Sequence, residues 1–356
     1  MIKPLTSLRF VFAFMVFMSH NILFDKGTNP FLHHLFYEGC VGVSFFFILS
    51  GFILTHVYQQ GFKENKISKG AFYVARFARI YPLHILTMLI WVYMRKDHPL
   101  NEPYITNFIS NVFLVQSFYP TDEIRFNTAA WSLSDEMFFY LLFPLLIAWF
   151  ATMKRKFVVG FTLASILVFI LCPIFSGTKN EEWFLYSYPP VRLLDFVLGI
   201  LFYNICQSVK RQDLVKKISP TLLELSAIVL FLSFYMIAYF IPEVYRYSMW
   251  YWLPVGVFIS VFYFQAGRIS KFLSNDTFIW LGEISFAFYM FHAIVLWYIR
   301  RTFILLDISV DKPIIFALGL ILTIVVSGLS FKYFETPANK WVKQKLSKYL
   351  LVKSSI

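Results

Sequence analysis

Charged residues are scarce in this chain of 356 residues. Only 15% are Asp, Glu, Lys or Arg, and 44 phenylalanines outnumber the 20 acidic residues. Soluble domains contain roughly a quarter charged residues. This shortage excludes an ordinary soluble protein and indicates that lipid surrounds the chain.

Cysteine is also rare, and Cys40, Cys172 and Cys206 are the three examples. An odd number of widely spaced cysteines excludes a disulfide framework, and the spacing matches no metal site. We therefore expect free thiols, no metal centre and no permanently bound cofactor. The first apolar run has no small-residue cleavage site after it, which predicts that it is retained as a helix.

Long apolar stretches are what the sequence has instead. A spanning helix needs about 20 mostly apolar residues to cross roughly 30 Å of hydrocarbon. The stretches predict an all-α, polytopic bundle of about ten spans. These spans are 5–24, 40–58, 80–95, 136–153, 157–175, 190–206, 222–241, 249–266, 279–299 and 313–333. Residues 103–126 mix aromatic with polar residues and predict an interfacial helix.

The net charge of +12 follows the predicted topology. With ten spans both termini lie on one side, and basic residues on that side outnumber those opposite by more than two to one. This bias predicts cytoplasmic termini and removes the reason to expect nucleic-acid binding. We predict one transmembrane domain at 1–341 and a short basic cytoplasmic tail at 342–356.

Two ionisable side chains lie inside the first span, where a charge is costly and indicates a functional site. Arg9 and His20 are separated by about 16.5 Å of helical rise and by three turns plus about 20°. They therefore share one helix face, with Arg9 nearer the cytosol. A cation below an imidazole suits an anionic substrate that enters from the cytoplasm. The structural alternatives are snorkelling of Arg9 to the inner headgroups and, for His20, a helix–helix hydrogen bond or a position at the end of the span.

A group of polar residues precedes the fourth span. Ser132 or Ser134 followed by Asp135 and Glu136 is typical of a helix N-terminus, where acids complement the helix dipole. Capping explains one acid more easily than two. This end is predicted to face outward, as His20 is, so Glu136 is a candidate to orient the imidazole. Ser134 and Asp135 are secondary candidates.

Three further groups lie in or beside spans. His292 is in mid-span, where a buried, hydrogen-bonded structural histidine is the more frequent case. Arg192 and Asp195 are three residues apart, so they are predicted to neutralise each other. Arg76 and Arg79 lie at a predicted cytoplasmic mouth. Positive-inside bias alone would place them there, but phosphate groups also favour arginine.

In this order, the motifs resemble the membrane-bound acyltransferase 3 family, whose bacterial members O-acetylate surface polysaccharides. The resemblance covers about residues 5–341, and six motifs in register are far more specific than any one of them. The motifs are Arg9-x10-His20, Gly42–Phe52, Arg76-x2-Arg79-Ile80-Tyr81-Pro82, Trp131-Ser132-Leu133-Ser134-x-Glu136, the His292 segment and Phe334-Glu335-Thr336-Pro337.

The resemblance implies transfer of an acyl group, usually acetyl, from cytoplasmic acyl-coenzyme A (acetyl-CoA) to an outward-facing hydroxyl. It implies catalytic roles for Arg9, His20 and Glu136, and donor binding by Arg9, Arg76 and Arg79. The expected partners are the lipid bilayer, acyl-CoA and a carbohydrate or other hydroxyl acceptor, at the cytoplasmic membrane of a bacterium. Some members carry a C-terminal hydrolase-like domain. This sequence ends soon after the last motif, so we expect direct transfer or a separate partner protein.

Residue chemistry leads to the same mechanism as a hypothesis. His20 deprotonates the acceptor hydroxyl while Glu136 orients the ring, and burial is expected to keep the imidazole neutral near pH 7. A covalent acyl-histidine is the second route. Ser44, Ser50 and Gly51 are predicted to let the second span approach the first closely.

Asp25 follows His20 with the His-x4-Asp spacing of soluble glycerolipid acyltransferases. Five residues turn a helix by about 500°, so the two side chains point apart unless the helix ends between them. On that argument we treat the match as chance.

Two other protein classes stay open at this point. A transporter or flippase of a lipid-linked sugar explains the spans and the intramembrane charges. It gives no reason for Arg9 and His20 to share a face, and no repeated halves are visible. A structural or sensory membrane protein leaves both residues unexplained. A transporter predicts movement of the acceptor without covalent change, which separates it from an acyltransferase.

Overall fold

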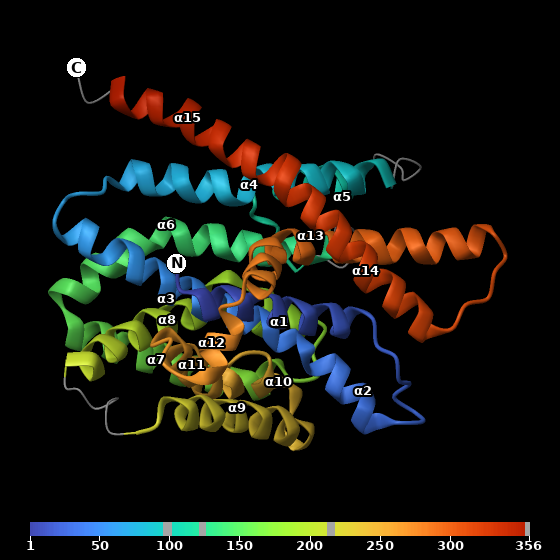
Figure 1. Ribbon diagram of the computed structural model, residues 1–356, viewed down its shortest axis with the longest axis horizontal. Helices are drawn as coiled ribbons and strands as arrows, with labels where there is room; N and C mark the ends of the chain where they lie inside the picture. Colours follow the sequence, from blue (N-terminus) through green and yellow to red (C-terminus); the bar gives the residue numbers. More distant parts are fainter. Residues whose placement is uncertain (95–101, 121–125, 212–217, 353–356) are drawn as a thin grey trace. The chain divides into compact units, whose positions relative to one another are not determined.

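The computed structural model describes residues 1–94, 102–120, 126–211 and 218–352 (Figure 1). Within these residues the chain forms helices and no strands. The α-helices are α1 Lys3–His20, α2 Pro30–Tyr37, α3 Val41–Lys63, α4 Lys69–Met94, α5 Glu102–Val112, α6 Trp131–Thr152, α7 Lys154–Phe175, α8 Pro189–Arg211, α9 Pro220–Ile237, α10 Glu243–Arg246, α11 Trp252–Tyr263, α12 Arg268–Leu273, α13 Asp276–Leu305, α14 Lys312–Ser330 and α15 Thr336–Val352.

The contacts within the chain define two compact units. Unit 1 consists of Met1–Val57, Trp149–Tyr186 and Pro190–Ser285. Unit 2 consists of Tyr58–Ala148, Ser187–Pro189 and Phe286–Ile356.

Eight segments of the described residues are long and apolar enough to cross a membrane, which confirms the all-α polytopic fold. They match eight of the ten predicted spans, and the other two predicted spans correspond to α1 and α11. The 18 residues of α1 include Lys3 and Arg9, which lower its hydropathy. The apolar segment around α11, Met249–Tyr263, is shorter than a full span.

The start of α4 differs from the prediction of a span over 80–95. The helix begins at Lys69 and continues through Pro82 to Met94. Arg76 and Arg79 therefore lie within α4, more than one turn after its start, rather than in a segment before it. Residue 95 is outside the described residues.

The predicted interfacial stretch forms a short helix, α5, of 11 residues. At 1.5 Å per residue this helix is about 16 Å long, which is too short to span a bilayer. Its polar residues Asn107 and Asn111 are buried, whereas Ile105 and Ile109 are about half exposed. An apolar outer side agrees with contact to lipid, and residues 121–125 of the stretch lie outside the described residues.

Close helix packing in unit 1 depends on glycine. A Cβ atom on Gly51 would lie 1.9 Å from the Phe196 carbonyl oxygen of α8, so α3 and α8 touch through their backbones. The prediction that Gly51 faces the first span is therefore wrong. Gly42 has that role, because a Cβ atom there would lie 2.4 Å from the Phe12 carbonyl oxygen of α1.

In unit 2, α15 packs along α4 (Figure 1). The Asn339 side-chain amide donates a hydrogen bond of 3.0 Å to the Ala78 carbonyl oxygen. The guanidinium of Arg79 forms an ion pair with the Glu335 carboxylate, whose side chain is 3% exposed. Two motifs that are far apart in the sequence, around Arg79 and Glu335, are thereby brought together.

Candidate active site

The first candidate pair lies on α1, which is one uninterrupted helix from Lys3 to His20. The predicted common face of Arg9 and His20 is therefore preserved. Arg9 is half-buried, but His20 is exposed. The predicted burial of the His20 ring is wrong, because the helix ends at this residue.

The His20 ring is oriented by its own helix. Its Nδ1 lies 3.0 Å from the Val16 carbonyl oxygen. A carbonyl oxygen only accepts, so Nδ1 carries the proton in this bond. In the neutral ring, Nε2 is then the basic nitrogen, which is the atom a general base needs.

The end of α1 also changes the geometry expected for Asp25. The helix ends at His20, and Asn21 has non-helical backbone angles. The rotation of about 500° expected for a continuous helix therefore does not apply between His20 and Asp25. The argument that the two side chains must point apart therefore does not apply.

The acidic motif lies in the first turns of α6, in unit 2. Asp135 is fully buried, and Glu136 is half-buried and accepts a hydrogen bond of 2.8 Å from the Tyr140 hydroxyl. Capping by Ser132 or Ser134 is a wrong prediction. The side chain of Asn127 caps the short 3-10 helix Thr128–Ala130 that leads into α6.

The two serines of this motif make tertiary contacts instead. The Ser132 hydroxyl lies 2.9 Å from the Tyr289 hydroxyl of α13, and Ser134 Oγ accepts a hydrogen bond of 3.4 Å from the Ser117 backbone N–H. His292 is 1% exposed, and its Nδ1 lies 2.5 Å from the Tyr289 carbonyl oxygen. Within unit 2 the acidic motif and the His292 segment therefore meet at Tyr289, and His292 has the surroundings of a structural histidine.

The two arginines of α4 have different surroundings. Arg79 pairs with Glu335, and its guanidinium carbon lies 5.2 Å from the Phe286 ring centroid. Arg76 donates a hydrogen bond of 3.2 Å to the Tyr58 hydroxyl and lies 5.9 Å from the Tyr140 ring centroid. Arg79 is thus neutralised by a carboxylate, whereas Arg76 contacts the two tyrosines.

The predicted ion pair of α8 is confirmed. Arg192 Nη2 lies 3.1 Å from Asp195 Oδ2, and both side chains are fully buried. Arg192 also donates to the Ser44 hydroxyl at 3.0 Å and to the Tyr247 carbonyl oxygen at 2.6 Å. Asp195 accepts from the Ser248 hydroxyl at 2.8 Å. The pair therefore links α8 to α3 and to the segment before α11.

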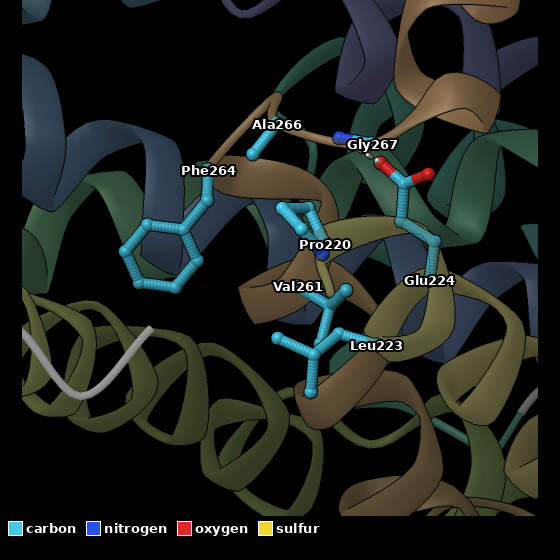
Figure 2. Close-up of a pocket in the computed structure, with 7 residues that line it drawn as sticks. All are labelled: Pro220, Leu223, Glu224, Val261, Phe264, Ala266 and Gly267. Atoms are coloured by element: carbon cyan, nitrogen blue, oxygen red, sulfur yellow. Dashed lines mark hydrogen bonds between the residues drawn. The ribbon is translucent and has the colours of Figure 1, made fainter. Parts of the chain in front are cut away.

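A pocket of about 180 Å³ lies in unit 1 between the start of α9 and the end of α11 (Figure 2). Its walls include Leu223, Val261 and Phe264, and none of the predicted site residues lines it. Glu224 stands at its edge and is 1% exposed. Arg9 and His20, the predicted catalytic residues of unit 1, are therefore not part of this pocket.

Sequence reasoning missed the role of Glu224. Its carboxylate accepts hydrogen bonds from the backbone N–H groups of Gly267, Ile269 and Ser270, at 2.9, 3.0 and 3.3 Å. These groups are the unsatisfied donors at the start of α12. The signal in the sequence was a single acid inside a predicted span.

Replacing Glu224 with alanine is expected to lower the free energy of unfolding by about 2 kcal/mol, because three backbone N–H groups, two of them buried, lose a charged acceptor. Unfolding by SDS in mixed micelles measures this change. The matched control is Glu64→Ala, since Glu64 is exposed and pairs with Lys66 at the surface, where ion pairs contribute little to stability. Equal losses for both variants would contradict the capping role.

Comparison with known proteins identifies the class to which this fold and these motifs belong. A family model described as an acyltransferase domain matches residues 4–332. The chain belongs to this acyltransferase family, so the predicted resemblance is confirmed and the protein is an enzyme.

Curated relatives agree with this assignment. The chain is 31% identical over 329 residues to acyltransferase MdmB of Streptomyces mycarofaciens, covering 84% of this chain and 80% of that protein. It is 24% identical over 329 residues to the peptidoglycan O-acetyltransferase OatA of Listeria monocytogenes, covering 85% of this chain and 51% of that protein. The chain thus spans about half the length of the Listeria relative. No solved structure matches significantly.

Proposed function

We propose that this enzyme transfers an acyl group, in the first instance acetyl, from cytoplasmic acyl-CoA to a hydroxyl of a cell-envelope carbohydrate. Membership of the acyltransferase family and similarity to a peptidoglycan O-acetyltransferase support this proposal. Family membership also favours transfer over a transporter or flippase. The proposed location is the bacterial cytoplasmic membrane, with both termini in the cytoplasm as the distribution of Lys and Arg predicts.

The observation that carries the mechanism is the arrangement of α1. Arg9 and His20 lie on one face of a single helix, and the Val16 carbonyl oxygen leaves His20 Nε2 as the basic nitrogen. A basic nitrogen at the exposed end of a helix can reach an acceptor that stays outside the bilayer. Arg9, about 16.5 Å along the helix, would attract the anionic donor toward that end.

The proposed reaction begins when the acceptor hydroxyl gives its proton to His20 Nε2. The hydroxyl oxygen attacks the thioester carbonyl carbon, the carbon–sulfur bond breaks, and the coenzyme leaves as a thiolate that takes up the proton. In the second route His20 Nε2 attacks the thioester carbonyl carbon, the carbon–sulfur bond breaks and the coenzyme leaves as a thiolate. The acceptor hydroxyl then displaces the acyl group from the imidazole, and the hydroxyl proton passes by way of His20 to the thiolate. Rapid acid quench with labelled donor distinguishes the routes, since only the second leaves label on the protein.

Glu136 is proposed as the residue that orients His20, and Asp25 is the competing carboxylate. Glu136→Gln is expected to lower the rate of transfer about tenfold, because a carboxylate stabilises the imidazolium that forms in the reaction. The initial rate with saturating acetyl-CoA measures this effect, and Asp25→Asn is the matched variant. A loss confined to Asp25→Asn would reassign the role to Asp25.

The donor assignment has its own test. Membranes that contain the protein are incubated with acetyl-CoA labelled in the acetyl group, and the glycan fraction is isolated. The proposal expects label on glycan, released by mild base as acetate. If the label stays in acetyl-CoA although active membranes and acceptor glycan are present, the choice of donor is contradicted.

A further inference from the structure

The pocket of unit 1 lies close to the helix that follows it, α12, and α12 contacts the start of α1. Gly267, the residue before α12, lines the pocket. The Ser7 hydroxyl of α1 donates a hydrogen bond of 2.5 Å to the Leu273 carbonyl oxygen of α12. The distribution of Lys and Arg predicts that this end of α1 lies on the cytoplasmic side. The pocket is therefore expected where hydrocarbon chains of the cytoplasmic leaflet meet their headgroups.

The size and the walls of the pocket suit a stretch of one hydrocarbon chain. Its volume of about 180 Å³ is close to the roughly 150 Å³ of an apolar cavity that holds one benzene molecule. It is smaller than the roughly 300 Å³ at which small-molecule sites begin. Leu223, Val261 and Phe264 line it (Figure 2), and the Glu224 carboxylate at its edge already accepts three backbone hydrogen bonds.

An apolar stripe begins beside the pocket and continues along α9. Leu222, Leu225, Val229 and Leu232 follow one another at intervals of three or four residues, so they share one helix face. Their side chains are between 47% and 61% exposed. A hydrocarbon chain with one part in the pocket can therefore continue along this face of α9 into the bilayer.

Two cations lie beside the pocket on α12. Arg268 follows Gly267 directly and Lys271 is three residues further, so the two side chains are neighbours on the helix surface. Both are exposed, and within the described residues neither has an ion-pair partner. Like charges at this spacing repel each other unless an anion offsets them. The next residue, Phe272, is 64% exposed, as is typical of a helix at the membrane surface.

The backbone at the start of α12 has its partners within the chain. Glu224 accepts hydrogen bonds from three of its N–H groups, and Thr221 Oγ1 accepts a fourth, from the Arg268 N–H, at 3.2 Å. An anion beside α12 would therefore be bound by the side chains of Arg268 and Lys271 rather than by the helix N-terminus.

We propose that unit 1 binds one anionic phospholipid of the cytoplasmic leaflet, with an acyl chain in the pocket and the phosphate on Arg268 and Lys271. Basic residues at the cytoplasmic ends of spanning helices bind anionic headgroups, and the adjoining pocket makes this place specific. The lipid contacts α9, α11 and α12 together. Because α12 is hydrogen-bonded to Ser7, the lipid also stabilises the start of α1.

The test is titration of the purified protein in neutral detergent with dioleoyl phosphatidylglycerol, with bound lipid counted by native mass spectrometry. Arg268→Gln/Lys271→Gln is expected to raise the Kd about 30-fold, because each cation contributes several-fold to binding of an anionic headgroup. Arg155→Gln/Lys156→Gln is the matched control. Arg155 and Lys156 are exposed cations at the start of α7 in unit 1, on the same predicted side, and their loss should leave the Kd unchanged.

Filling the pocket tests the acyl chain separately from the headgroup. Val261→Phe is expected to raise the Kd for the same lipid about tenfold, because the added ring occupies the space of the chain. Resistance to unfolding by SDS should not fall, since filling a cavity does not destabilise the fold when the ring fits. Leu163→Phe is the control, because it adds a ring to the exposed surface of α7 outside the pocket.

Three results would overturn the inference. The first is an equal Kd for the wild type and for folded Arg268→Gln/Lys271→Gln. The second is an equal loss for the two double variants, which would indicate unspecific attraction of anionic lipid to basic residues. The third is an unchanged Kd for Val261→Phe, which would leave the acyl chain outside the pocket. Competition by glycerol phosphate at the same concentration as the lipid would also overturn it, since the ligand would then be a free phosphate compound. None of these results bears on acyl transfer.

Discussion

His20→Ala is expected to lower the rate of acyl transfer by about 10²–10⁴-fold, which is the contribution of a positioned general base. The fold should persist, because His20 is the exposed last residue of α1. The measurement is the initial rate of transfer from labelled acetyl-CoA, with equal amounts of folded protein in each membrane preparation.

His33→Ala is the matched control for this variant. His33 also belongs to unit 1, is half-buried on α2 and has no role in the proposed reaction. Its rate should equal that of the wild type. A full rate for His20→Ala would place the base elsewhere, and equal losses for both variants would indicate damage to the fold.

Arg192→Met is expected to produce the largest loss of stability, about 3–5 kcal/mol in the free energy of unfolding. The substitution leaves the Asp195 carboxylate fully buried without the guanidinium beside it. It also removes the hydrogen bonds to Ser44 and to the Tyr247 carbonyl oxygen. Titration with SDS in mixed micelles measures the change.

The double variant Arg192→Met/Asp195→Leu isolates the buried charge as the cause. Removing both partners removes the uncompensated carboxylate, so the double variant is expected to be more stable than Arg192→Met alone. If instead the double variant loses as much stability as Arg192→Met and Asp195→Leu lose separately when summed, the destabilisation comes from packing and hydrogen bonds rather than from the buried charge.

Local patterns in the sequence were sufficient to predict the elements that depend on them. Apolar runs predicted the helical bundle, and the spacing of Arg192 and Asp195 predicted their ion pair, because both depend on helical geometry. Helix starts were predicted less well. The helix α4 begins at Lys69, well before its most apolar part, so the apolar run alone did not predict its start. The start of α6 depends on Asn127, which caps the preceding 3-10 turn.

Contacts between distant segments could not be predicted from these patterns. Arg79 and Glu335 are 256 residues apart, and no periodicity relates them. The capping of α12 by Glu224 likewise depends on tertiary packing. The exposure of His20 depends on where α1 ends, a boundary that apolar periodicity defines poorly.

The most direct test of the central claim is mass analysis of cell-surface glycans from cells that express the wild type or His20→Ala. The account predicts a glycan heavier by one acyl group in wild-type cells and its absence in His20→Ala cells. Identical glycan masses, with a changed amount of surface glycan, would contradict acyl transfer and favour a flippase.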